Sequence, residues 1–195
     1  DDCGEYLDNH AFLGFNRLSI IDLSANGHQP MPDLSQRYWI VFNGEIYNFQ
    51  ELRKLIEHKH ILRSRTDTEV VLYLYMVYGA GMLAYLDGMF AMAIWDSEDK
   101  TLFLARDRFG EKPIWYVSNE QGIAFSSEIR TLLRTGMVSG SIDPSGVYRY
   151  PWLGTSVYGK SVIAGIEGIK PGHYIQYQLD RTPTQVPYWK LQDTP

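Results

Sequence analysis

Cysteine is almost absent from this chain of 195 residues. Cys3 is the only one, so an intrachain disulfide is impossible, and this usage is typical of a reducing, cytoplasmic compartment. Long apolar runs are absent too. No stretch approaches the roughly 20 residues that cross a bilayer, and none opens the chain as a signal peptide would. These absences argue against a membrane protein and against a disulfide scaffold.

An excess of basic charge is also missing. Eighteen Lys and Arg face 23 Asp and Glu, for a net charge of −5, and the basic residues are scattered. A nucleic-acid partner would require a basic stripe, and none is present. The five histidines have no metal-ligand spacing, and no glycine-rich loop of the Walker or Rossmann kind occurs. We therefore expect no metal and no nucleotide cofactor in this chain.

Aromatic residues, by contrast, make up 14% of the chain, which favours strands. Apolar patterning predicts strands over 11–21, 38–42, 89–95, 101–106, 114–117, 123–126 and 173–178. Helices are predicted after capping signals at Asn48, Thr66 and Asp143, with a short one near 128–134. Blocks of strands and helices without β-α-β alternation predict an α+β fold with largely antiparallel sheets. The polar, proline-containing tail 181–195 is interpreted as a linker after a domain over 1–180.

Asn43-Gly44-Glu45 follows a predicted buried strand. A side-chain amide and a free backbone N–H that point the same way can form an oxyanion hole. Gly44 would also let a substrate approach the backbone closely. An isolated Asn-Gly pair is more often a plain β-turn, so this spacing alone leaves both interpretations open.

Charged residues give two further candidates. Arg17, among apolar neighbours, can present a planar fork to a carboxylate, although a surface Arg with its stem on the sheet is the commoner case. Asp67 begins the best predicted helix, where it can cap the helix or bind an ammonium group. Thr66 offers a competing cap, which frees Asp67 for a ligand. For the charged loop 106–113 a local ion-pair network is the preferred interpretation.

Taken in order, seven motifs resemble the glutaminase domain of asparagine synthetases, and the resemblance runs from Asp1 to about Tyr188. The motifs are Arg17-Leu18-Ser19-Ile20-Ile21-Asp22, Gly27-His28-Gln29-Pro30, Phe42-Asn43-Gly44-Glu45-Ile46-Tyr47-Asn48, Thr66-Asp67-Thr68-Glu69, Gly88-Met89-Phe90-Ala91, Arg106-Asp107-Arg108-Phe109-Gly110 with Lys112-Pro113, and Ser127-Glu128-Ile129. Seven ordered motifs in one chain are far more specific than any one of them.

The resemblance implies an N-terminal-nucleophile fold, a four-layer α/β/β/α sandwich with two antiparallel sheets between helices. It implies that an N-terminal Cys thiol attacks the side-chain amide of glutamine, with its own α-amino group as the base. Arg17 would clamp the glutamine α-carboxylate, Asp67 would hold its α-ammonium group, and the Asn43 side chain with the Gly44 N–H would hold the oxyanion. The rest of the pocket would come from Leu18, Ser19, Ile20, Ile21 and Glu45.

The implied partners are glutamine and a C-terminal synthetase domain, in which ATP and Mg would serve to activate aspartate; a homodimer is left open. Two alternatives remain. The chain could serve another glutamine-dependent synthetase, such as one modifying a cell-surface sugar or a β-lactam precursor. It could also be a non-catalytic module that binds glutamine without a nucleophile.

Cys3-Gly4 departs from the family pattern in its position. Asp1-Asp2-Cys3-Gly4 aligns with an Asp-Asp-Ser-Gly segment that lies after the nucleophile strand, and residues 5–9 are too polar for a central buried strand. We therefore reject Cys3 as the nucleophile and expect the catalytic Cys to be absent from the chain. Without it the chain would be inactive, and without its strand only marginally stable.

Overall fold

The structure, a computed structural model, describes residues 2–17, 27–153, 159–179 and 181–191. Its largest element is a six-stranded antiparallel sheet with the order β11-β10-β6-β5-β4-β3. The strands of this sheet are β3 (Met31–Pro32), β4 (Tyr38–Ile46), β5 (Gly88–Asp96), β6 (Thr101–Arg106), β10 (His173–Gln178) and β11 (Gln185–Pro187). The α+β class expected from the sequence is confirmed.

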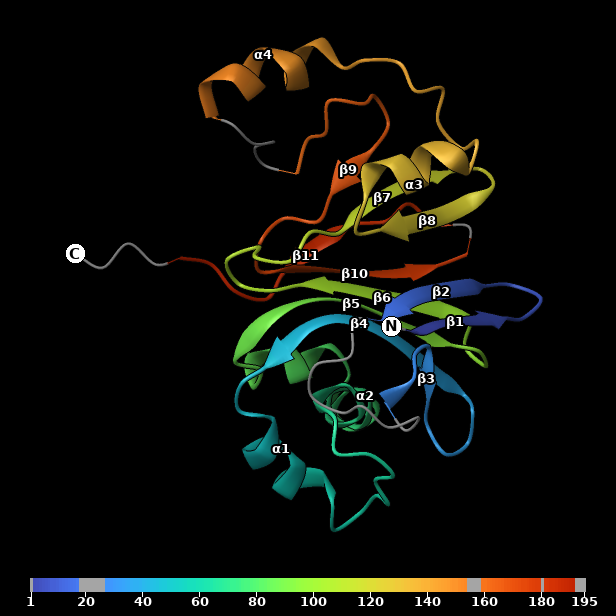
Figure 1. Cartoon of the computed structure of the whole chain (residues 1–195), viewed down its shortest axis with the longest axis vertical. Helices are drawn as coiled ribbons and strands as arrows, with labels where there is room; N and C mark the ends of the chain where they lie inside the picture. Colours follow the sequence, from blue (N-terminus) through green and yellow to red (C-terminus); the bar gives the residue numbers. More distant parts are fainter. Residues whose placement is uncertain (1, 18–26, 154–158, 180, 192–195) are drawn as a thin grey trace.

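Helices cover one face of this sheet (Figure 1). They are α1 (Phe49–Ile56), α2 (Asp67–Tyr78) and the 3-10 helix η2 (Gly79–Ala84). Thr66 caps α2, since its hydroxyl accepts a hydrogen bond from the Glu69 N–H, and Gly79 ends it at a φ of 55°. Both boundaries agree with the sequence. The core on this side joins α2 to β4, β5 and β6 through residues such as Leu72, Phe90 and Phe103.

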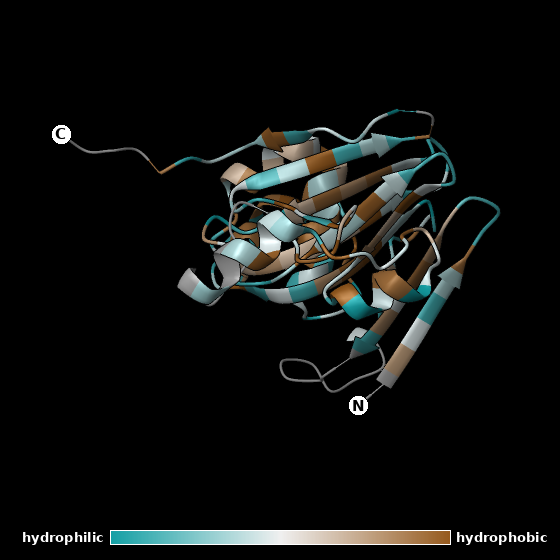
Figure 2. Cartoon of the chain, turned by 90° about the horizontal axis from the view of Figure 1, so that it is seen from above, coloured by the Kyte–Doolittle hydropathy of each residue, from teal (hydrophilic) through white to brown (hydrophobic). Residues whose placement is uncertain are grey.

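Two small antiparallel sheets cover the other face (Figure 1). One is the hairpin of β1 (Asp2–Leu7) and β2 (Phe12–Arg17); the other has the order β8-β7-β9. Its strands are β7 (Trp115–Asn119), β8 (Gly122–Ser126) and β9 (Glu167–Gly168), against which α3 (Ile129–Arg134) packs. A second helix, α4 (Pro144–Leu153), follows Asp143 as predicted. Hydrophobic residues concentrate along the central strands and hydrophilic ones at the turns (Figure 2).

The β1–β2 hairpin is fixed to the large sheet through Asp8. The Asp8 carboxylate accepts hydrogen bonds from the Trp95 indole N–H at 2.8 Å and from the Tyr6 hydroxyl at 2.8 Å. Tyr6 also stacks on Trp39, with ring centroids 4.0 Å apart. Sequence patterning gave no strand over 2–7, because its Glu5 and Leu7 side chains both face solvent.

Several local expectations were wrong. Asn48 precedes α1 but makes no side-chain cap; its amide bridges the Tyr85 carbonyl and the Asp87 N–H instead. The loop after β6 is held by backbone hydrogen bonds rather than by ion pairs. Arg106 donates to three carbonyls, and the fully buried Asp107 carboxylate accepts four backbone N–H groups. The tail expected to be a linker contributes β11, which pairs with β10.

Candidate functional site

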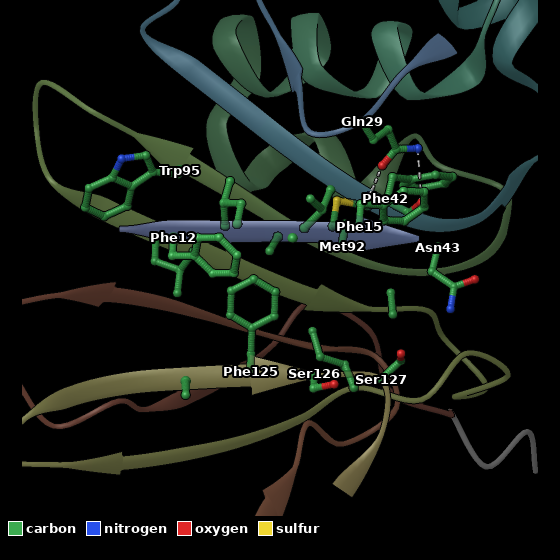
Figure 3. A pocket seen from close by; sticks show the side chains of 18 of the residues that line it. Phe12, Phe15, Gln29, Phe42, Asn43, Met92, Trp95, Phe125, Ser126 and Ser127 are labelled. Carbon is green, nitrogen blue, oxygen red and sulfur yellow. Dashed lines mark hydrogen bonds between the residues drawn. The ribbon is translucent and has the colours of Figure 1, made fainter. Parts of the chain in front are cut away.

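A large groove runs between the two small sheets, with a cavity volume of about 1410 Å³. Its walls are β2 and β8, and its floor is the large sheet, including Val41, Ala91 and Ala93. Phe12, Phe15 and Phe125 project into it (Figure 3). Within the described residues, β2 pairs only with β1 and β8 only with β7, so each wall presents an unpaired strand edge. An apolar groove between two free edges has the shape of a site for one extended strand.

Asn43 lies at one end of this groove (Figure 3). Side chains alternate along β4, so Asn43 and Glu45 lie on the same face as Val41, which belongs to the core beneath the small sheets. Phe42 and Ile46 point to the opposite face and pack against the helices. The Asn43 side chain is exposed. Its amide is therefore available to a ligand in the groove.

Gly44 presents its backbone N–H to the open edge of β4. Successive N–H groups of a strand point to opposite sides, and those of Phe42 and Ile46 point away from β5, toward the Gln29 and Asp67 side chains. The N–H of Gly44, midway between them, points the same way. No side chain in the described part of the chain accepts from it. Gly is required here, because a Cβ would collide with the Met89 carbonyl oxygen and lie 2.7 Å from the Phe90 Cα.

Asp67, the first residue of α2, is only 4% exposed yet lines the same cavity. One carboxylate oxygen accepts the Ile46 N–H at 3.0 Å and the other accepts the Thr68 N–H at 2.8 Å. Desolvation by burial raises the pKa of Asp67, and the N–H groups of Ile46 and Thr68 oppose that shift. Thr66 caps the helix as expected, but Asp67 is not wholly free, since it also fastens β4 to α2.

The cavity thus brings together four sequence-predicted residues: Asn43, Gly44, Glu45 and Asp67. Arg17 is the residue predicted to clamp the α-carboxylate of the substrate. Only its backbone is described, and it pairs with Asp2 at the end of β2. Its neighbour Asn16 lines the cavity. The predicted lining residues Leu18, Ser19, Ile20 and Ile21 lie outside the described residues.

Cys3 is exposed and lies within β1, opposite Asn16. It also lines the cavity. Its own nitrogen is part of a peptide bond, so it has no α-amino group of the kind that serves as the base for an N-terminal nucleophile.

Sequence reasoning gave no role to Gln29, Ser126 or Ser127, which also line the cavity. Gln29 is buried at the edge of β4, while the two serines lie at the end of β8, across the groove from Asn43 (Figure 3). The signal for Gln29 was available in the Gly27-His28-Gln29-Pro30 motif, but a motif match alone does not show which backbone its side chain contacts.

Two features are absent from residues 2–17, 27–153, 159–179 and 181–191. No group of three or more His, Cys, Asp or Glu side chains is placed to hold a metal ion. No helix among those residues is both long and apolar enough to cross a membrane.

Comparison with known proteins places this chain in a family. Residues 1–189 match the glutamine amidotransferase domain. Asparagine synthetase [glutamine-hydrolyzing] 1 of Bacillus subtilis (strain 168) is 36% identical over 196 residues, which cover 100% of this chain and 31% of that protein. Asparagine synthetase [glutamine-hydrolyzing] 3 of the same organism is 34% identical over 184 residues, 92% of this chain and 30% of that protein.

Amidase chry2 of Gibberella zeae is 31% identical over 95% of this chain and 27% of its own length. Among solved structures, glutamine phosphoribosylpyrophosphate amidotransferase from B. subtilis superposes with a TM-score of 0.60 at 16% identity, covering 90% of this chain and 34% of that one. That likeness supports the fold alone. The chain spans about a third of the length of these relatives, and by its match over nearly all of its residues it belongs to the glutamine amidotransferase domain family.

Proposed function

We propose that this chain is the glutaminase domain of a glutamine-hydrolysing asparagine synthetase. The observation that carries the proposal is the common cavity of Asn43, Gly44 and Asp67. Asp67 supplies a buried carboxylate suited to an α-ammonium group, and Asn43 with Gly44 supplies two donors suited to an oxyanion. Arg17 is the proposed partner of the α-carboxylate, with Leu18, Ser19, Ile20, Ile21 and Glu45 completing the pocket.

In the proposed reaction the thiol of an N-terminal cysteine attacks the amide carbon of glutamine while its proton passes to the α-amino group of the same cysteine. The new C–S bond moves the carbonyl electron pair onto oxygen, where the Asn43 amide and the Gly44 N–H stabilise it. Collapse of this intermediate breaks the C–N bond, and the nitrogen takes the proton and leaves as ammonia. Water then hydrolyses the thioester to glutamate and restores the thiol.

The nucleophile in this proposal is not Cys3 but an N-terminal cysteine on a strand that fills the groove between β2 and β8. Such a strand would pair with both free edges and join the two small sheets into one. The result would be a four-layer α/β/β/α sandwich, with α1 and α2 outside one sheet and α3 and α4 outside the other. The chain without that strand would be inactive.

The larger protein would consume the ammonia in a C-terminal synthetase domain that amidates aspartate with ATP and Mg. The glutaminase domain itself would use no metal or cofactor, in a cytoplasmic enzyme that could assemble as a homodimer. Two relatives are named asparagine synthetases, which favours aspartate over a sugar or a β-lactam precursor as the ammonia acceptor. A third relative is named Amidase chry2, so a different acceptor is the alternative. A non-catalytic glutamine-binding module is the other alternative.

Ammonia release from glutamine by the intact gene product tests the proposal. We expect release in wild type, release slowed by about 10²–10³ in Asn43→Ala at matched concentration, and full release in Cys3→Ser. Loss of activity in Cys3→Ser with retained folding would overturn the assignment of the nucleophile. Binding of glutamine without any hydrolysis by the intact wild-type protein would favour the non-catalytic module.

A further inference from the structure

Gln29 makes a two-point contact with the backbone of β4 one residue before Asn43. Its side-chain oxygen accepts the Phe42 N–H at 2.6 Å, and its amide nitrogen donates to the Phe42 carbonyl at 3.3 Å (Figure 3). The residue is 7% exposed. Among the described residues β4 has no neighbouring strand at this point, because β3 pairs only with Trp39 and Ile40, and a primary amide takes the place of one.

The same amide reaches the other side of the candidate site. Its nitrogen lies 3.5 Å from the Thr68 hydroxyl, which is itself 3.5 Å from the Asp67 carboxylate. Asp67 in turn accepts the Ile46 N–H. Two side chains thus fasten the peptides on either side of Gly44, and Thr68 connects them.

We infer that Gln29 is a positioning residue that holds the Asn43–Gly44 donors in the geometry needed to stabilise an oxyanion. It does not touch the substrate; it acts by fixing the Phe42 peptide, from which the Asn43 side chain and the Gly44 N–H take their directions. This inference rests on the proposed glutaminase function. Because the oxyanion exists only after attack on the amide, a loosened Gln29 contact affects kcat more than KM.

The primary test is Gln29→Met in the intact gene product, which removes both hydrogen bonds at similar volume. Misplacement of catalytic donors by about 1 Å costs up to about 100-fold in rate. We expect kcat to fall on the order of 10-fold to 100-fold, while KM for glutamine changes by less than about threefold. Amide exchange at Phe42 should accelerate, because its N–H loses the Gln29 acceptor, while the core of α2 stays protected.

Gln29→Glu adds a readout that simple destabilisation would not produce. A protonated carboxyl group can accept from the Phe42 N–H and donate to its carbonyl as the amide does, whereas a carboxylate cannot donate. The ratio of variant to wild-type kcat should therefore rise on acidification. Asp67 and Glu45, the nearby acidic groups on the adjoining elements, are present in both proteins, so the ratio isolates the introduced group.

Gln185 offers a matched control, because it also bridges backbone, accepting the Lys170 N–H at 2.9 Å and donating to the Gly168 carbonyl at 3.2 Å. Gln185→Met should leave kcat unchanged. The inference is overturned if folded Gln29→Met keeps wild-type kcat, or if the Gln29→Glu ratio does not change with pH. If Gln29→Met does not fold, the pH response of Gln29→Glu decides. Absence of ammonia release by wild type would refute the proposed function itself, a separate result.

Discussion

Asp67 holds the Ile46 N–H at 3.0 Å and thereby ties the start of α2 to the edge of β4, two residues beyond Gly44. The carboxylate is buried and lines the groove, and no described cationic side chain forms an ion pair with it. A buried carboxylate whose hydrogen-bond partners are neutral donors, here the Ile46 and Thr68 N–H groups and the Thr68 hydroxyl, can still accept from an ammonium group. We therefore expect the affinity for glutamine to depend on the charge of Asp67.

Asp67→Asn should weaken glutamine binding on the order of 2–5 kcal/mol, because the ligand ammonium group then faces a neutral amide. Calorimetric titration of glutamine into the intact protein measures the change. Asp33→Asn is a matched control: Asp33 is also buried and accepts the Tyr38 N–H, but it does not line the groove. An equal loss of affinity in both variants would contradict the assigned role.

Glutamine binding should weaken on acidification from a pH above the ordinary aspartate value. Burial raises the folded-state pKa of Asp67 above its model-compound value of 3.8. Its contribution to stability is therefore complete below the unfolded pKa and is lost as the pH rises through the folded pKa. The ammonium group of glutamine requires the ionised carboxylate. The affinity for glutamine therefore rises as the pH rises through the folded-state pKa of Asp67, and falls on acidification. The step in affinity should be missing from Asp67→Asn; a step that persists in this variant would assign the titration to another group.

Asn43→Ala should lower kcat by about 10²–10³ with little change in KM, because one of the two oxyanion donors is removed. Steady-state ammonia release measures both constants. Asn48→Ala, which removes an asparagine that bridges two backbone groups outside the groove, should keep kcat. A KM effect without a kcat effect in Asn43→Ala would place this side chain in ground-state binding instead.

The sequence predicts most strands and the α2 boundaries, because apolar spacing, the Thr66 cap and Gly79 are local signals. It also predicts that Asn43, Gly44, Glu45 and Asp67 share a site, but only through family resemblance. The β1 strand and β11 escape local reasoning because they are edge elements with exposed side chains, stabilised by distant partners such as Trp95 and β10. Gln29 and Asp107 escape it because their partners are backbone groups, which no side-chain pattern specifies.

Gly110→Ala should destabilise the fold by about 2–5 kcal/mol, the left-handed backbone cost together with the cost of overpacking. Gly110 has a φ of 71°, and an added Cβ would lie 2.7 Å from the Pro171 Cγ and 3.1 Å from the Arg106 Cζ. Gly136 has a φ of 73° with open space around it, so Gly136→Ala carries only the left-handed backbone cost of ~1–2 kcal/mol. Urea unfolding of both variants measures the difference. Equal costs would show that the Arg106–Gly110 contact gives way without loss.

The groove between β2 and β8 predicts a stability gain on strand addition. Extension of the chain by the proposed N-terminal strand should add ~2 kcal/mol or more, about 4–8 °C in Tm for a domain of this length, because two free edges become paired. The same extension with a proline at its centre lacks one N–H of the ladder and should give a smaller gain. Thermal unfolding compares the three proteins. A sharp, high-temperature transition in the unextended chain, unchanged by extension, would contradict the proposal.

A crystal structure of the intact protein with L-glutamate, the proposed product, tests the central claim most directly. We predict the ligand ammonium nitrogen within about 3.2 Å of an Asp67 carboxylate oxygen, and a side-chain oxygen of the ligand within the same reach of the Asn43 amide and the Gly44 N–H. A ligand bound in the reverse orientation, or at a site that omits Asp67 and Asn43, would contradict the account.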